Sequence, residues 1–369
     1  MKIVYIVHDY TNSAGIERVV SLKSNYFVNI GYDVHIVSCC HEEKEPFFEF
    51  DSRIKFYNLA LPSIRVKYKK LFVDRLSLYL KDVKPDIAIS TGMRVMNYLY
   101  EVNDGSKKIL ETHFSKYRRK FKLAKLENSK LGRILLNAYY FKFNKIVRRY
   151  DKFVVLTNED KKSWLIANIP NIEVIPNPLT FIPEKSSDLK TKRIIAVGRY
   201  TYQKGFDQIF DIWHKIESLY PDWILTLYGT GAKGAKLKSK IQSLNLGGRV
   251  ELRPPVKDIS KEFLHSSIFA LPSRYEGLPM VLLEAMVCGV PAVCFACKCG
   301  PRDVIIDGED GFYVEMGDEK KFKERLTLLM DDVVIRQKMG KQARENIMFL
   351  KEENVMPKWI SLFEGLFVP

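Results

Sequence analysis

The sequence has no apolar stretch long enough to cross a membrane, because its longest apolar runs stay well short of about 20 residues. The first residues, Met1 to His8, hold one lysine and a short apolar run, and no small-residue cleavage site follows them. We interpret them as a first β-strand. We expect the protein in the cytoplasm, in peripheral contact with the inner face of the plasma membrane. A 46% share of apolar residues favours a folded chain over a disordered one.

Cysteine is sparse, with six residues in a chain of 369. Cys294, Cys297 and Cys299 stand close together, but no fourth ligand accompanies them at a spacing typical of zinc sites. Structural disulfides are rare in the cytosol. We therefore interpret the cysteines as small buried residues or loop thiols, and we predict no bound metal.

Acidic residues are nearly absent from the segment between Ser115 and Arg149, which holds twelve lysines or arginines and a single acidic residue, Glu127. The net charge of the whole chain is +15. Aromatic and aliphatic residues alternate with these cations at helical spacing, which suits a helix lying on anionic lipid; packing of its apolar side in the core is the alternative. Proteins that bind nucleic acids by base stacking place their aromatic residues on strands instead. The candidate cations for membrane or acceptor are Lys116, Arg118, Arg119, Lys120 and Lys122.

Short β-rich runs alternate with helical patterns along the chain, which predicts parallel sheets covered by helices. The length favours two domains. The first set of predicted strands is Ile3–Val7, Val34–Ser38, Ile54–Tyr57, Ile87–Ser90, Lys108–Glu111, Phe153–Leu156 and Glu173–Ile175. The second set is Arg193–Val197, Ile224–Tyr228, Val250–Leu252, Ile268–Leu271, Ala292–Phe295 and Gly311–Val314.

The polar run from Pro183 to Lys192 separates the two sets and predicts a linker. We expect two Rossmann-like domains, residues 1–180 and 181–350. A last helix, about residues 351–369, is expected to cross back onto the first domain.

Two glutamates, Glu276 and Glu284, stand eight residues apart. Gly277 and Pro279 predict the start of a helix, whose first N–H groups lack intrahelical partners and attract phosphate. Glu284 would lie about two turns along this helix. Phosphate-binding groups beside two carboxylates suit a ligand with hydroxyls next to its phosphates, such as a nucleotide sugar. Solvated surface charge is the plain alternative.

Other loops after predicted strands carry cations and glycines. Arg199 and Lys204 follow one strand of the second set, where two fixed cations could hold a diphosphate. Gly229 and Gly231 follow the next strand, and glycine lets the backbone approach a ligand closely. In the first half, Gly15 begins a helix after the first strand and forms a second possible phosphate or acceptor loop.

Together these residues resemble family 4 of the retaining glycosyltransferases, which have the α/β GT-B fold of two Rossmann-like domains facing a central cleft. The resemblance covers nearly the whole chain and is densest from Gly198 to Val314. The matching motifs, in the family's order, are Val197-Gly198-Arg199, Gly205-Phe206-Asp207, Glu276-x7-Glu284, Gly300-Pro301, Asp307-Gly308 and Gly311-Phe312.

The resemblance implies a role for each matching position. Arg199 and Lys204 would bind the donor diphosphate and stabilise the leaving group. Glu276 would contact hydroxyls of the donor sugar, and Glu284 would receive the ribose hydroxyls. The remaining candidates for donor binding are Gly15, Gly198, Gly229, Gly231, Gly277, Leu278, Pro279, Met280 and Val281.

Three positions of the first domain also match. His113 resembles the family histidine near the sugar and acceptor, although a lone histidine is often structural. Glu17 and Arg18 would face the acceptor, and ordinary helix-start chemistry explains them as well.

The family generally needs no bound metal, and no Asp-x-Asp triplet lies beside a predicted strand end. The sequence that follows Gly300 resembles transferases that build bacterial surface glycans from UDP-sugars. The resemblance therefore implies transfer, with retention, of a hexose or N-acetylhexosamine to a hydroxyl of a lipid-linked glycan precursor. A sugar phosphorylase, a nucleotide-sugar epimerase and a basic nucleic-acid-binding protein are the alternatives left open.

Overall fold

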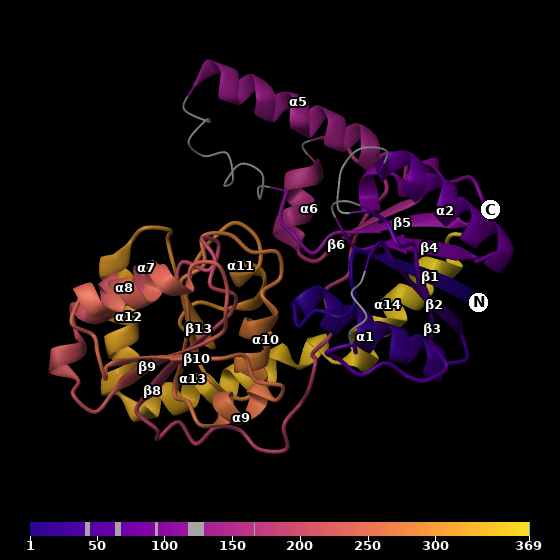
Figure 1. Ribbon diagram of the computed structural model, residues 1–369. Coiled ribbons are helices and arrows are strands. Elements are labelled where there is room, and N and C mark those ends of the chain that lie inside the picture. The colour runs from indigo at the N-terminus through magenta and orange to yellow at the C-terminus, as the bar shows by residue number, and fades with distance from the viewer. Residues whose placement is uncertain (41–44, 63–67, 93–94, 117–128, 166, 369) are drawn as a thin grey trace. The chain divides into compact units, whose positions relative to one another are not determined.

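The computed structural model describes residues 1–369 except 41–44, 63–67, 93–94, 117–128, 166 and 369. The chain divides into two compact units (Figure 1). Unit 1 comprises Met1–Thr180 and Glu352–Pro369, and unit 2 comprises Phe181–Lys351.

Unit 1 contains a parallel sheet in the order β3-β2-β1-β4-β5-β6-β7. Its central strands are rich in valine and isoleucine and are buried on both faces, as parallel strands between helices usually are. The strands are β1 (Lys2–Val7), β2 (Asp33–Ser38), β3 (Lys55–Asn58), β4 (Ile87–Ser90), β5 (Lys107–Glu111), β6 (Lys152–Val155) and β7 (Ile172–Val174).

The helices of unit 1 include one from the end of the chain. Phe363 of this last helix packs against Phe27 of the first, with ring centroids 5.3 Å apart, and Figure 1 shows the two helices side by side. The helices are α1 (Gly15–Asn29), α2 (Tyr68–Val83), α5 (Lys130–Val147), α6 (Asn158–Leu165) and α14 (Glu352–Glu364), with short 3-10 turns at Val95–Asn97 and Leu99–Glu101.

Unit 2 repeats the parallel arrangement, with strand order β10-β9-β8-β11-β12-β13. Its strands are β8 (Arg193–Val197), β9 (Ile224–Tyr228), β10 (Val250–Arg253), β11 (Ile268–Leu271), β12 (Ala292–Phe295) and β13 (Gly311–Val314). Its helices are α7 (Phe206–His214), α8 (Gly234–Ser243), α9 (Ile259–Leu264), α10 (Met280–Val287), α11 (Pro301–Val304), α12 (Glu319–Asp331) and α13 (Val333–Asn346), with 3-10 turns at Glu217–Leu219 and Ile347–Leu350.

Every predicted strand is present, with ends within one residue of the prediction. The order of strands reverses between β1 and β4 in unit 1 and between β8 and β11 in unit 2. In open parallel sheets, ligands bind beyond the carboxyl ends of the strands at such a switch point. The loops after these strands are therefore the places to examine.

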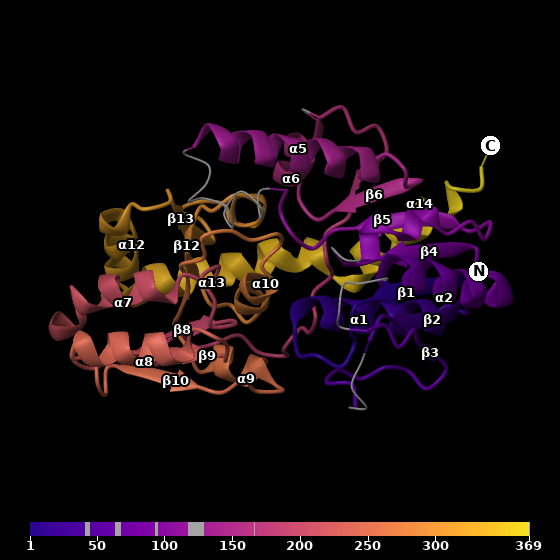
Figure 2. The same ribbon diagram turned by 45° about the horizontal axis from the view of Figure 1, so that its top comes forward.

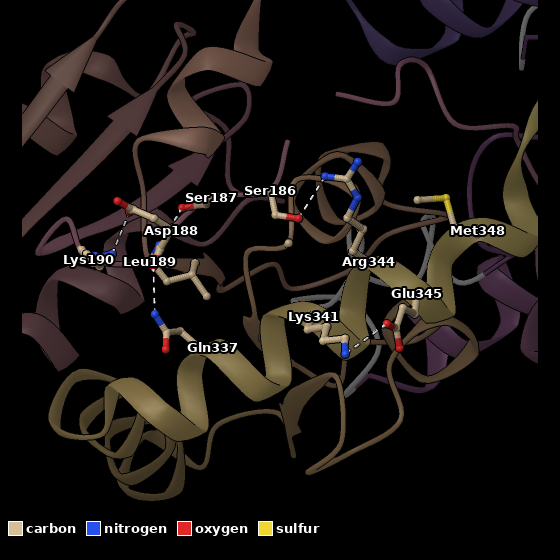
Figure 3. A pocket seen from close by; sticks show the side chains of 11 residues that line it. Ser186, Ser187, Asp188, Leu189, Lys190, Gln337, Lys341, Arg344, Glu345 and Met348 are labelled. Atoms are coloured by element: carbon tan, nitrogen blue, oxygen red, sulfur yellow. Dashed lines mark hydrogen bonds and ion pairs between the residues drawn. The ribbon is translucent and has the colours of Figure 1, made fainter. Parts of the chain in front are cut away.

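The polar run from Pro183 to Lys192 is not a linker, contrary to the prediction. It packs on α13, where the carbonyl oxygen of buried Leu189 accepts hydrogen bonds from Nε and Nη2 of Arg336 at 3.1 and 2.9 Å. Figure 3 shows the run beside α13, where Arg344 donates to Ser186 Oγ. The buried Arg336 guanidinium requires carbonyl acceptors, and composition alone does not reveal that this run supplies them.

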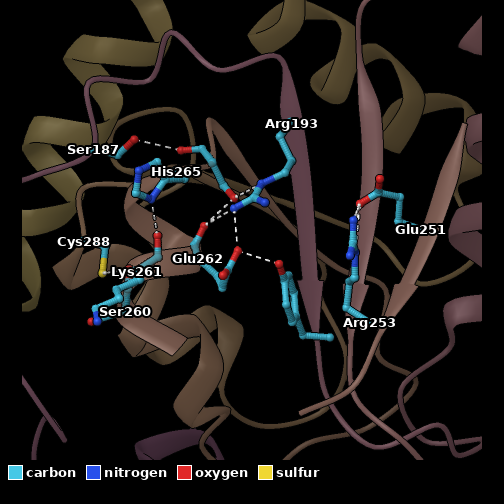
Figure 4. Close-up of polar contacts among 11 residues, drawn as sticks. Ser187, Arg193, Glu251, Arg253, Ser260, Lys261, Glu262, His265 and Cys288 are labelled. Carbon is cyan, nitrogen blue, oxygen red and sulfur yellow. Dashed lines mark hydrogen bonds and ion pairs between the residues drawn. The ribbon is translucent and has the colours of Figure 1, made fainter. Parts of the chain in front are cut away.

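A second network of hydrogen bonds in the same unit joins α9 to the sheet. Arg193 of β8 donates to the carboxylate of Glu262 in α9 at 2.9 Å, and the Tyr228 hydroxyl of β9 donates to that carboxylate too (Figure 4). These bonds hold α9 against β8 and β9.

Candidate active site

The loops after β8 and β11 meet at the switch point of unit 2. β8 pairs directly with β11 in parallel, so their carboxyl ends lie at the same edge of the sheet. The loop after β8 carries Arg199 and Lys204, and the loop after β11 carries Glu276. The topology thus brings together residues that lie more than seventy positions apart in the sequence.

Glycines allow these loops to approach closely. Gly205 has φ +65°, and a Cβ atom there would lie 2.0 Å from the carbonyl oxygen of Pro272. A Cβ atom on Gly229 would lie 2.0 Å from the carbonyl oxygen of Gly198. Backbone therefore packs on backbone where no side chain fits, and a Cβ atom on Gly231 would lie 2.8 Å from the carbonyl oxygen of Tyr200.

Lys204 and Glu276 form an ion pair at the junction. Lys204 Nζ donates to Glu276 Oε1 at 2.8 Å, and Gln203 Nε2 donates to Oε2 at 3.2 Å. The side chains of Lys204 and Glu276 are 14% and 6% exposed. Glu276 is therefore a buried and oriented carboxylate, and the alternative of a solvated surface charge does not describe it.

Arg274 braces the same two loops. Its guanidinium donates to both carboxylate oxygens of Asp207, at 2.8 and 2.6 Å, and to the carbonyl oxygen of Tyr202 at 2.9 Å. Burial alone would raise the pKa of Asp207, but the hydrogen bonds and charge of Arg274 outweigh burial, so this pKa lies below its usual value. The brace holds the loop after β8 against the loop after β11.

α10 begins beside this junction, as predicted from Gly277 and Pro279. Pro279 is its N-cap residue, and the helix runs from Met280 to Val287. Helix starts present backbone N–H groups and a positive partial charge, which favour phosphate. Glu284 lies on this helix and is 5% exposed, so it too is buried. The backbone candidates Leu278 and Val281 are in the same first turn and the residues before it.

Arg199 differs from Lys204 in its surroundings. Its side chain is exposed, and within the described residues it makes no hydrogen bond or ion pair. An exposed guanidinium can form bidentate bonds with an anionic ligand.

The first turn of α1 holds the three loop candidates of unit 1. Gly15 is exposed at the start of the helix, after the N-cap residue Ala14. Glu17 is the acidic residue of this turn, and the Arg18 guanidinium lies 5.7 Å from the centroid of the Phe48 ring. The structure thus places these candidates together, at the carboxyl end of β1.

His113 follows β5 and is buried. Its Nε2 atom lies 3.2 Å from Glu111 Oε1, although the two are not aligned as a hydrogen bond. Burial lowers the pKa of His113 to about 4, an effect that the Glu111 carboxylate opposes and the Lys23 ammonium reinforces. The imidazole is therefore neutral near pH 7.

Lys116, a predicted membrane or acceptor cation, is bound to α6. Its Nζ donates to the carbonyl oxygen of Ser163 at 2.9 Å and lies 4.6 Å from the centroid of the Trp164 ring, while its backbone N–H donates to Asp160. Burial lowers the pKa of Lys116, with partial compensation from Asp160. The other predicted cations, Arg118, Arg119, Lys120 and Lys122, lie outside the described residues.

The exposed face of α5 is apolar and basic. Figure 2 shows α5 at the margin of unit 1. Four large apolar side chains of the helix are more than half exposed: Leu131 (67%), Ile134 (63%), Leu135 (51%) and Phe141 (74%). The other side, including Leu136 and Phe143, is buried in the core. The core interpretation therefore describes one side of this helix, and the membrane interpretation stays a prediction for its exposed side.

Membrane-spanning helices and metal clusters are both absent from the described residues. No helix there is long and apolar enough to span a membrane. No group of three or more histidine, cysteine or acidic side chains there is arranged to hold a metal ion.

Comparison with known proteins decides the family. Residues 180–346 match the group 1 glycosyl transferases. The chain is 30% identical to an uncharacterized glycosyltransferase of Haemophilus influenzae, over 99% of both proteins. The chain belongs to this family of glycosyltransferases. It is also 30% identical to the amylovoran biosynthesis glycosyltransferase AmsD of Erwinia amylovora, over 97% of this chain and 98% of that protein.

Another relative has a more specific name. A UDP-Gal:alpha-D-GlcNAc-diphosphoundecaprenol alpha-1,3-galactosyltransferase of Escherichia coli is 30% identical over 53% of this glycosyltransferase and 55% of its own length. That name states a UDP-sugar donor and a lipid-diphosphate acceptor for the relative.

Solved structures show the same fold. A sucrose-phosphate synthase from Thermosynechococcus elongatus has a TM-score of 0.84 and 17% identity, with 99% of both chains covered. TarM of Staphylococcus aureus, in a complex with UDP, has a TM-score of 0.80 and 16% identity, with 98% of this chain and 99% of TarM covered. The glycosyltransferase has the predicted GT-B fold of two parallel-sheet α/β domains.

The structure adds residues that the sequence prediction missed. In unit 2 they are Gln203, which holds Glu276, and the Arg274–Asp207 brace. Gln203 directly precedes Lys204 in the sequence, and this position could have identified it as a candidate site residue. In unit 1 they are Lys23 of α1 and Glu111 of β5, which pair across a long stretch of sequence that gives no signal of the contact.

Proposed function

We propose that this glycosyltransferase moves a hexose or N-acetylhexosamine from a UDP-sugar to a hydroxyl of a lipid-linked glycan precursor in bacterial surface polysaccharide synthesis. The observation that carries the proposal is the buried Lys204–Glu276 pair beside the start of α10, at the switch point of unit 2. Family membership supplies the reaction class. The names of the Erwinia and Escherichia relatives support the glycan product and the lipid-linked acceptor.

The donor would occupy the loops at this switch point. Arg199, Lys204 and the first N–H groups of α10 would hold the diphosphate. As the diphosphate draws the Lys204 ammonium, the Glu276 carboxylate becomes available to accept hydrogen bonds from sugar hydroxyls, because a carboxylate is an acceptor only. Glu284 would receive the ribose hydroxyls further along the helix.

Transfer with retention is part of the proposal. The acceptor oxygen bonds to the anomeric carbon on the face from which the phosphate departs, while the bond from that carbon to the phosphate oxygen breaks. The departing oxygen takes the proton of the acceptor hydroxyl. Arg199 and Lys204 stabilise the negative charge on the leaving diphosphate. Glu276 already accepts hydrogen bonds from two side chains, which favours a binding role over that of a covalent nucleophile.

No metal takes part in the proposed reaction. Two cations and a helix start provide positive charge for the diphosphate, which is the task that a divalent ion performs elsewhere. Transfer should therefore proceed unchanged in excess EDTA.

Peripheral attachment to an anionic membrane surface is proposed through α5. The helix combines exposed apolar side chains with the cations Lys130, Arg133, Lys142 and Lys145, and the sequence from Asn128 to Tyr150 holds no acidic residue. Such a face enters the headgroup boundary with its apolar side chains while its cations meet lipid phosphates. This attachment would bring the enzyme to a lipid-linked acceptor.

A donor screen followed by a transfer assay tests the proposal. Thermal unfolding is measured with UDP-galactose, UDP-N-acetylgalactosamine, UDP-glucose, UDP-N-acetylglucosamine and GDP-mannose, since a donor that binds the native state raises its stability. We expect protection by at least one UDP-sugar. That donor should then give an α-linked product on a lipid-diphosphate-linked N-acetylglucosamine. Protection by GDP-mannose alone would refute the UDP-sugar assignment, and a β-linked product would refute retention.

The alternative activities give different products from the same donor. In the absence of acceptor, an epimerase converts the UDP-sugar to its epimer, whereas a phosphorylase needs inorganic phosphate and produces a sugar 1-phosphate. We expect neither product. Either one, formed at the rate of transfer or faster, would replace the proposed function.

A further inference from the structure

A buried ion pair lies directly behind His113 in unit 1. Lys23 of α1 donates to both carboxylate oxygens of Glu111 at the end of β5, at 2.7 and 2.6 Å. The side chains of Lys23 and Glu111 are 1% and 0% exposed. The pair is therefore almost completely removed from water.

Two aromatic rings surround the ammonium group. Lys23 Nζ lies 4.0 Å from the centroid of the Trp359 ring of α14 and 5.5 Å from that of Tyr5 in β1. Removing two charges from water is costly, and well-packed neutral residues often replace such a pair without loss of stability. The fold alone does not require these charges here, which indicates that they orient a neighbouring group.

That group is the imidazole of His113. Glu111 Oε1 lies 3.2 Å from His113 Nε2, and both groups are buried. An ionised carboxylate only accepts hydrogen bonds, so it favours the tautomer with hydrogen on Nε2 and the lone pair on Nδ1. The contact is not aligned as a hydrogen bond in the ligand-free protein, and catalytic bonds often align only when substrate is present.

We propose that Glu111 and Lys23 are positioning residues that hold His113 as the neutral Nε2–H tautomer, with Nδ1 available to accept a hydrogen bond from a sugar hydroxyl. This inference rests on the proposed function and on the place beside the donor sugar that the family resemblance implies for His113. The two hydrogen bonds from Lys23 fix the orientation of the Glu111 carboxyl group, and Trp359 covers the ammonium from α14. The last helix of the chain therefore takes part in orienting the imidazole.

The test is a pair of substitutions that keeps side-chain length and removes both charges, Glu111→Gln with Lys23→Met. We expect this variant to fold, with a melting temperature within about 4 °C of wild type. With UDP-galactose and a lipid-diphosphate-linked N-acetylglucosamine, kcat should fall about 100-fold while KM for UDP-galactose changes less than about threefold. In a His113→Gln background, the same substitutions should lower kcat less than about threefold further.

A matched control is available on the same strand. Lys108 and Asp104 form another buried ion pair, with side chains 8% and 0% exposed, near the opposite end of β5. Asp104→Asn with Lys108→Met should leave kcat within about twofold of wild type. This control separates the effect of losing a buried pair from the effect of losing the group behind His113.

A measurement without substrate tests the orientation directly. The chain has six histidines, so imidazole nitrogen shifts of 15N-histidine-labelled protein can be assigned with the His113→Gln variant. We expect Nε2–H in wild type and a mixture of tautomers in the Glu111→Gln, Lys23→Met variant. An Nδ1–H tautomer in wild type, or an equal loss of kcat with and without His113, overturns the inference. Wild-type turnover in His113→Gln itself would instead refute the proposed role of His113.

Discussion

Glu276 and Lys204 carry opposite charges and form a buried ion pair. The effect of removing one charge can therefore be compared with the effect of removing both. Lys204→Met leaves a buried carboxylate that still accepts a hydrogen bond from Gln203, and Glu276→Gln leaves a largely buried ammonium. Breaking such a pair costs about 3 kcal/mol of unfolding free energy, whereas removing both charges costs much less. We expect the double variant to recover most of the stability that either single variant loses.

Activity should not recover with stability. Each single variant and the double variant should lose transfer by a factor of about 100 or more, because the residues would act on the donor in the transition state. Urea unfolding measures the stability of each variant, and release of UDP from the donor measures its transfer activity. As a control, Lys192→Met removes an exposed pair with Asp222 in the same unit and should change neither. Recovery of transfer in the double variant would contradict the roles assigned.

The pKa of Asp207 predicts a pH dependence of stability. Although burial opposes it, Arg274 lowers this pKa in the folded protein. The contribution of the brace is therefore present above the pKa of the unfolded chain, about 3.9, and is lost as pH falls through the lower folded value. Melting temperatures of wild type and an Asp207→Asn, Arg274→Gln variant, measured from pH 7 to pH 3, should converge at the acid end. A difference that grows toward acid pH would contradict the brace.

At the scale of elements, most strands were predictable because they are short buried runs of aliphatic and β-branched residues bounded by turns or charges, whereas the exposed edge strand β3 is marked only by its aromatic residues Phe56 and Tyr57. The switch-point loops could be predicted because they follow such strands. The packing of Leu189 on Arg336 and the Lys23–Glu111 pair could not be predicted, because each joins segments far apart in sequence without a periodic signal. Likewise, the resemblance identified Lys204 and Glu276 separately, and only the fold shows that they pair.

The loop that joins β8 to α7 is packed so closely that adding a single methyl group, by Gly205→Ala, should lower the stability strongly. Gly205→Ala adds a Cβ atom at φ +65° and 2.0 Å from the carbonyl oxygen of Pro272, so the loops must separate. We expect a loss of about 3 kcal/mol in unfolding free energy and weaker UDP binding. Gly248→Ala is the control, because Gly248 has φ +75° with nothing within 4 Å, and it should cost only about 1 kcal/mol. If both variants lost the same unfolding free energy, the strain of a positive φ would explain the loss, and the close contact between the loops would not.

The exposed face of α5 predicts binding to anionic vesicles. Replacing Leu131, Ile134 and Phe141 with serine should weaken co-sedimentation with phosphatidylglycerol vesicles about tenfold or more, because their apolar area no longer enters the bilayer. Leu219→Ser removes a similarly exposed apolar side chain (74%) from unit 2 and should have no effect. Binding should also weaken as salt rises from 0.05 to about 0.5 M. Unchanged binding of the triple variant would exclude α5 as the docking surface.

At the scale of the whole molecule, the ligand groups divide between the two units. The residues assigned to the diphosphate and the ribose lie in unit 2 apart from Gly15, and so does Glu276, which is assigned to the sugar. His113, which is also assigned to the sugar, lies in unit 1 together with its positioning residues and α5. Unit 1 also includes α14 from the end of the chain. UDP, which lacks the sugar and the acceptor, should therefore act mainly on unit 2.

This division predicts how UDP changes stability. At 100 times its dissociation constant, UDP adds about 2.7 kcal/mol to the unfolding free energy of the unit that binds it. Hydrogen exchange should slow throughout the core of unit 2, including β12 and α12, and change little in β2 and β3 of unit 1. Glu284→Gln, which removes the proposed ribose contact, should raise the dissociation constant about tenfold and reduce the added stability by about 1.4 kcal/mol at the same UDP concentration. Equal slowing in both units would contradict this assignment, because UDP would then stabilise unit 1 as much as unit 2.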